Sequence, residues 1–258
     1  MKSETKKFEQ MKNELARKGE MKQDMVPIPE FLKASMGDMR GNEEVTQNDI
    51  SIPRIELIQG LSKARKKTDP SYIDGAEEGM LFNNVTRELY GYSVKVIPIM
   101  FRKEFLLWRS IDLGGGFGGS YPDQILAQQA RIERENPSEW DIVDTNQHFV
   151  MVLHDDGSTE EAVISMAKTK SRTSRMWNSL IRMNGGPRFS RVYQIEGIPA
   201  QNKSGQDYYT LSVKLLGFVT EQQFKKAEKV YAMIKSSAVA VNTEFDGIDI
   251  GPFDGGEM

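Results

Sequence analysis

The sequence contains no cysteine, which excludes disulfide bonds, thiolate metal sites and a cysteine nucleophile. Histidine is nearly as scarce, with only 2 residues in 258. The sequence therefore offers few residues for imidazole catalysis or for a histidine-rich metal centre. The lack of cysteine also fits a reducing compartment such as the cytoplasm.

Long apolar runs are missing as well. No segment approaches the roughly 18 residues that a membrane-spanning helix requires. The first ten residues, MKSETKKFEQ, are charged throughout and do not resemble a secretory signal. Only 38% of the residues are hydrophobic and 28% are charged, so part of the chain should lie outside a packed core. We expect a soluble cytoplasmic protein without a membrane partner.

The distribution of apolar residues predicts three parts. Residues 1–48 read as a flexible arm, with contact to a neighbouring subunit or another partner as the alternative. Dense apolar segments begin near residue 49 and continue to 236, which predicts the folded core. Residues 237–258 form a tail that contains acidic residues and no lysine or arginine; such tails are commonly disordered.

Within the core, alternating apolar residues predict strands joined by hairpins. Residues 92–101 read as a strand, and 105–109 should pair back on it. Asp155-Asp156-Gly157 predicts a hairpin between strands at 147–153 and 161–166, and strands at 188–198 and 207–219 form a second hairpin. Helices are predicted at 123–135 and 221–235. This order predicts a mainly β fold with α additions: an antiparallel, OB-like Greek-key barrel, with a basic helix between late strands and a C-terminal helix.

The most distinctive stretch runs from 162 to 195 and has no acidic residue in a chain of net charge -3. Helical spacing places Lys168, Arg172, Arg175 and Arg182 on one face, opposite Met176 and Trp177. Trp177 is therefore expected in the core. Arginine offers a planar donor fork that suits phosphate, although a solvated helix face is the alternative. The predicted phosphate contacts are Lys168, Arg172, Arg175, Arg182, Arg188 and Arg191.

A second predicted binding element is the glycine-rich segment 114–119. It lacks the Gly-Lys-Ser/Thr ending of a phosphate-binding P-loop, so we reject nucleotide binding there. We expect a hairpin tip that carries Phe117, with Trp108 and Arg109 beside it, although it can equally be a plain flexible loop. Trp108, Phe117 and Tyr193 are the predicted stacking residues for bases.

The acidic tail ends in FDGIDIGPFDGGEM. Its simplest role is solubility. Its acidic groups also suit an electrostatic mimic of nucleic acid that occupies the basic surface until DNA displaces it. Phe245, Phe253 and Asp254 are the predicted contacts to partner enzymes.

No enzyme site can be argued from the residues. His148 and His154 lie six positions apart near one strand, too far to share a metal by strand rise. Asp155-Asp156 with Glu160-Glu161 is the only candidate for a metal-dependent nuclease, and the hairpin turn explains the aspartates better. We predict no catalytic residue, no metal and no cofactor.

Several blocks carry a family resemblance: IPRIELIQG, VIPIMFRKEFLLWR followed by GGGFGGSY, SRMWNSLIRMNGGPRFSRVY, and YYTLSVKLLGFVTEQQFKKA. They resemble a group of tailed-phage proteins over roughly residues 50–235. In general plan the chain is also similar to the single-stranded-DNA-binding proteins of T7-type phages. It departs from them in its long arm and in a tail that does not end on phenylalanine.

Together these features predict a single-stranded-DNA-binding protein of phage replication or recombination in the infected cell's cytoplasm, with little sequence preference. Replication or recombination enzymes, docking on the tail, and further copies of the chain are possible partners. The alternative is a non-enzymatic interaction or structural protein that docks on a host or virion component.

Overall fold

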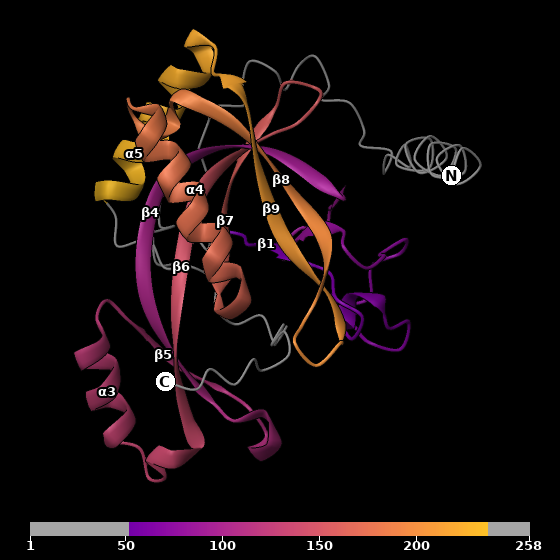
Figure 1. The fold of residues 1–258 in the computed structure, drawn as a ribbon, viewed down its shortest axis with the longest axis vertical. Coiled ribbons are helices and arrows are strands. Elements are labelled where there is room, and N and C mark those ends of the chain that lie inside the picture. Colours follow the sequence, from indigo (N-terminus) through magenta and orange to yellow (C-terminus); the bar gives the residue numbers. More distant parts are fainter. Residues whose placement is uncertain (1–51, 237–258) are drawn as a thin grey trace, which may run out of the picture. The chain divides into compact units, whose positions relative to one another are not determined.

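The computed structural model describes residues 52–236. The predicted arm at 1–48 and the predicted tail with Phe245, Phe253 and Asp254 lie outside the described residues. Between 52 and 236 the fold is mainly antiparallel β-sheet with a few helices (Figure 1), which confirms the predicted class.

The larger sheet has six strands in the order β7-β6-β4-β8-β9, with β5 beside β4. Strand β4 is its spine: it pairs with β6 along its length, with β8 at its first residues and with β5 at its last. The strands are β4 (Ser93–Arg109), β5 (Phe117–Tyr121), β6 (Trp140–Leu153), β7 (Thr159–Ala167), β8 (Arg191–Gln201) and β9 (Asp207–Phe218).

This sheet is open, so the predicted closed barrel is not found. Strands β7 and β9 stand at the two ends of the order and do not pair with each other. The expectation that 105–109 turns back on 92–101 was also wrong. The chain runs straight through Arg102-Lys103-Glu104, whose members bond to β6 as part of one 17-residue strand. Pro98 is accommodated by a bulge before Met100, as a proline within a sheet requires.

A smaller sheet joins three short strands in the order β1-β2-β3. These are β1 (Ile55–Leu57), β2 (Leu81–Asn83) and β3 (Leu89–Gly91). Ile55, Leu57 and Leu81 share a core cluster with Val94 and Ile195 of the larger sheet. The approach is close at Gly197, where an added Cβ would lie 2.1 Å from the carbonyl oxygen of Gly79.

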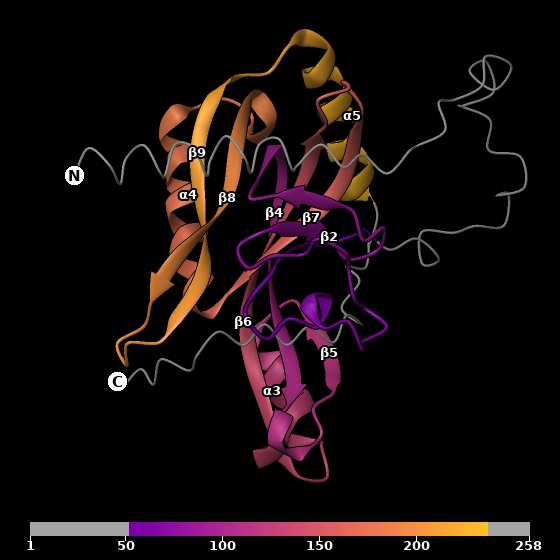
Figure 2. The same cartoon turned by 90° about the vertical axis from the view of Figure 1, so that its right-hand side faces the viewer.

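Both faces of the larger sheet are apolar. Successive residues of a strand point to opposite sides, and on β6 both sets are apolar. Val150 and Val152 join one core cluster, and Phe149 and Met151 join the other. Helix α4 (Ser171–Asn184) covers the first face through Trp177, and α5 (Glu221–Ser236) covers the second. Figure 2 shows the two helices on opposite sides of the sheet.

Helix α3 (Gln124–Ile132) follows β5 and contacts β4, β5 and β6 at the end of the sheet away from α5 (Figure 1). The Asp123 side chain caps it by accepting a hydrogen bond from the Leu126 N–H at 2.9 Å. Within 52–236, no helix combines the length and apolarity needed to cross a membrane.

Candidate nucleic-acid interface

Helix α4 presents a row of guanidinium groups to solvent. Arg172, Arg175 and Arg182 are exposed and share one face of the helix by their three- and seven-residue spacing. No ion pair joins any of the three to a carboxylate of residues 52–236. The predicted basic helix therefore exists, and these three cations are unneutralised by the described part of the protein.

The opposite side of α4 enters the core. Trp177 is fully buried and Ser174 nearly so, which confirms the predicted core position of the tryptophan. The prediction was wrong for Met176, which is exposed. The helix ends at Gly185 with φ 64°, in the predicted Asn-Gly-Gly-Pro stop, because a left-handed residue closes a helix and glycine adopts it without strain.

Lys168 begins the short turn that precedes α4, with a left-handed φ of 49°. The residue is exposed, yet desolvation of its ammonium lowers its pKa, and the charge of Asp141 acts in the opposite direction. Lys168 therefore precedes the arginine row of α4 in the chain.

Arg188 does not lie on the exposed row. Its Nη1 donates to Asn178 Oδ1 at 2.9 Å, and its Nη2 donates to His148 Nδ1 at 2.9 Å. Its guanidinium also lies over the rings of Phe101 and Trp177, while its Nε is buried without a partner. Burial lowers the pKa of Arg188 to about 10. The prediction of a phosphate contact at Arg188 is replaced by an internal bridge between α4 and β6.

His148 is the other half of this bridge and is completely buried. Arginine can only donate, so Nδ1 must be the bare nitrogen, and the proton lies on Nε2, which donates to Ser174 Oγ at 2.8 Å. The imidazole stacks on Trp177 with 4.5 Å between ring centroids. Burial first, and the charge of Arg188 second, lower the pKa of His148 to about 3, so it is a neutral structural group.

Arg191 also has internal partners. Its Nη2 donates to the carbonyl oxygen of Asn184 at 2.7 Å, and its Nη1 donates to that of Gly185 at 2.8 Å. These are carbonyls at the end of α4 that the helix leaves without intrahelical partners. Its guanidinium covers the ring of Phe218 at 4.7 Å. The predicted phosphate contact is therefore corrected: Arg191 caps the helix.

The predicted stacking residues divide into two groups. Tyr193 is 1% exposed and packs on Trp177, so it is core and cannot stack on a base. Trp108 and Phe117 face each other across β4 and β5, with 5.1 Å between ring centroids, and Phe117 is 38% exposed. The structure brings these two together as expected.

Arg109, at the same hairpin, is bound by Glu139. Its Nε and Nη2 both donate to Glu139 Oε2, at 2.9 and 2.7 Å. A guanidinium held by a carboxylate has little positive charge to offer a phosphate. The hairpin tip itself is as predicted: Gly114, Gly115 and Gly116 all have positive φ.

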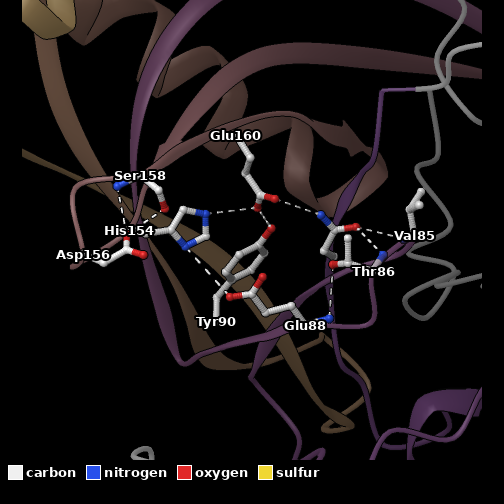
Figure 3. Close-up of polar contacts among 9 residues, drawn as sticks. Val85, Thr86, Glu88, Tyr90, His154, Asp156, Ser158 and Glu160 are labelled. Atoms are coloured by element: carbon white, nitrogen blue, oxygen red, sulfur yellow. Dashed lines mark hydrogen bonds and ion pairs between the residues drawn. The ribbon is translucent and has the colours of Figure 1, made fainter. Parts of the chain in front are cut away.

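Figure 3 shows the surroundings of Asp156 and Glu160, two of the acidic residues considered for a nuclease site. Glu160 accepts a hydrogen bond from the Tyr90 hydroxyl and lies 3.7 Å from His154 Nε2. Burial, and then Glu160, raise the pKa of Tyr90. Asp156 accepts from Ser158 and shapes the hairpin turn. Among residues 52–236 no group of acidic and histidine side chains is arranged to hold a metal, and these contacts tie the small sheet to the β6–β7 hairpin.

Sequence patterns missed one exposed aromatic, Phe218, which is 77% exposed at the end of β9. The alternation of Leu211, Val213 and Leu215 assigns position 218 to the opposite face of the strand. A bulge changes this: Leu215 pairs with Tyr193, but Gly217 pairs with Val192. No local sequence signal predicts that bulge.

Comparisons with known proteins identify the family. No curated protein matches the chain, and no solved structure does. The family model described as Pam3 phage gp34-like protein matches residues 20–240. This match supports the predicted phage origin and spans all the described sheets and helices; the chain belongs to the family of Pam3 phage gp34-like proteins.

Proposed function

We propose that this protein is a non-enzymatic, single-stranded-DNA-binding protein of phage replication or recombination. The observation that carries the proposal is the row of Arg172, Arg175 and Arg182 on α4, exposed and without a carboxylate partner among residues 52–236. Unneutralised guanidinium groups on one helix face favour a polyanion, because each can pair with a phosphate.

The scaffold supports this role without a closed OB barrel. Trp177, His148 and Arg188 fix α4 against the sheet, so the exposed cations stand on a rigid element. Rigid placement lowers the conformational entropy lost on binding. With Lys168 at the start of the row, the surface has cations along the length of α4.

The test is the affinity of the full-length protein for a fluorescent single-stranded oligonucleotide, measured by anisotropy. Replacing Arg172, Arg175 and Arg182 together by alanine should weaken binding by at least about 10-fold, since each contact to a phosphate is lost together with its counterion release. All three side chains are exposed, so the variant should fold normally.

Helix α5 supplies a matched control on the opposite face of the sheet. Lys226, Lys229 and Lys235 are exposed there, and replacing them by alanine removes the same net charge. If both triple variants lose the same affinity, the effect is one of overall charge, and α4 is not the binding surface.

A second candidate function has its own observation. Helix α3 exposes Ile125, Leu126 and Ile132, two of them more than 60% exposed, and large apolar side chains exposed on one short helix favour an interaction site. This favours an interaction or structural protein that docks on a host or virion component. That function predicts no oligonucleotide binding even at micromolar protein, which separates it from the first.

A further inference from the structure

The end of β9 has an unusual arrangement of side chains. The bulge between the pairs Leu215–Tyr193 and Gly217–Val192 leaves Leu216 as the extra residue. Directly paired residues in a sheet share a face, so Leu215 lies with buried Tyr193 and Phe218 lies with Arg191. Arg191 binds the end of α4. The bulge therefore turns Phe218 toward the α4 side of the sheet.

Arg191 holds the Phe218 ring from one side. Its guanidinium is fixed by Asn184, Gly185 and Ser190, with donor–acceptor distances of 2.7, 2.8 and 3.1 Å, and lies 4.7 Å from the Phe218 ring centroid. A cation at this distance is attracted to the ring face. With the ring still 77% exposed, Phe218 has one face supported by an immobilised cation and another open to solvent.

The neighbourhood of this ring is cationic. Arg182 is exposed in the last turn of α4, directly before the Asn184 and Gly185 carbonyls that Arg191 binds. Polyanions are therefore drawn to the region, and the open aromatic face offers their bases a flat apolar surface. Arginine beside an aromatic platform is the combination that single-strand binders use for backbone and base.

We propose that Phe218 is a stacking platform for an unpaired base of single-stranded nucleic acid. This proposal rests on the proposed function and deepens it, because it specifies how single strands are distinguished from duplex: a base inside a duplex has no free face to stack. Every base has an aromatic face, so the platform is tolerant of sequence.

Phe218→Ala provides the first test. Binding of oligothymidylate should weaken by roughly 5- to 150-fold, the range found for loss of one stacked base. Binding of an abasic oligonucleotide of equal length should be unchanged, because only the phosphate contacts remain. Phe218→Tyr should bind oligothymidylate like the natural protein.

A second readout reports the contact itself. Phe218→Trp places an indole on the platform, and oligothymidylate should quench its emission while the abasic strand does not. Thermal unfolding of each variant checks that the fold is intact, as expected for so exposed a ring.

The outcomes distinguish the two proposals. If the natural protein binds neither strand, the proposed function itself fails. Suppose instead that the natural protein binds oligothymidylate. If Phe218→Ala then binds it equally well, or loses the same affinity for oligothymidylate as for the abasic strand, the stacking role is wrong while DNA binding stands. If Phe218→Ala instead converts a dimer to a monomer in sedimentation without changing DNA affinity, the occupant of this surface is a second copy of the chain, and the stacking proposal is overturned.

Discussion

Arg188 and His148 together attach helix α4 to strand β6. Arg188 is held by neutral groups, Asn178 and His148, and no carboxylate of residues 52–236 forms an ion pair with it. A mostly buried cation of this kind is costly unless its hydrogen bonds are kept. His148 can accept from Arg188 only while it is neutral, so the protonation state of one imidazole determines how α4 is attached.

Replacing His148 by alanine should therefore destabilise the protein strongly. The change leaves Arg188 Nη2 without its acceptor and opens a cavity between Phe101 and Trp177. We expect a loss of about 2–5 kcal/mol in the free energy of unfolding, measured by urea denaturation. His154→Ala, at the other and partly exposed histidine, should cost less than about 1 kcal/mol. Equal losses would contradict the role assigned to His148.

The same residue predicts a pH dependence of stability. The pKa of His148 is lowered from 6.5 to about 3 in the folded protein, so below pH 6.5 the unfolded chain binds a proton that the folded chain does not. Stability is thus full above 6.5 and falls as the pH falls toward 3. Between about pH 7.5 and about pH 5.5 the loss should be about 1.3 kcal/mol. The pH profile of His148→Gln, which cannot titrate, should lack this component; identical profiles would refute it.

At the scale of elements, hairpins and helices were predictable, and strand length was not. The β6–β7 and β8–β9 hairpins have clear turn residues, and α4 has a regular pattern with a glycine stop. By contrast, Arg102-Lys103-Glu104 interrupts the apolar pattern and still lies within β4, since partner strands satisfy its backbone. The exposure of the α4 arginines could be predicted from their helical spacing. The inward turn of Arg188 and the bulge that exposes Phe218 depend on tertiary contacts, which local patterns do not contain.

The contact between the two sheets predicts how a substitution at Gly197 affects stability. Gly197→Ala would push a methyl group into the Gly79 carbonyl, 2.1 Å away, and should destabilise the protein by about 1–3 kcal/mol or more. Gly217→Ala, in the neighbouring strand, meets nothing within 4 Å and should be neutral. Thermal or urea unfolding compares the pair. A neutral Gly197→Ala would mean that the small sheet is not packed on β8 as described.

For the whole molecule, charge is unevenly distributed along the chain. The net charge is -3, yet residues 162–195 hold no acidic residue, and residues 236–258 hold no basic one. Opposite charges on one chain attract at low ionic strength, because screening is weak there. This asymmetry motivates the proposal that the tail competes with nucleic acid for α4.

Deleting residues 243–258 should then tighten oligonucleotide binding at low salt, and the gain should vanish as salt rises and screens the attraction. Anisotropy titrations of the full-length and truncated proteins at several salt concentrations make the comparison. A truncated protein that binds no more tightly than the full chain at the lowest salt would exclude competition by the tail.

The salt dependence of single-stranded-DNA affinity tests the central claim most directly, because its slope counts phosphate contacts. Each cation that neutralises a phosphate contributes about -0.7 to the slope of log affinity against log salt. Replacing Arg172, Arg175 and Arg182 by alanine should therefore make the slope shallower by about 2. The control variant, in which the three lysines of α5 are replaced by alanine, should keep the natural slope. A natural protein whose binding does not change with salt, or an α4 variant with an unchanged slope, would contradict the assignment of α4 as the DNA-binding surface.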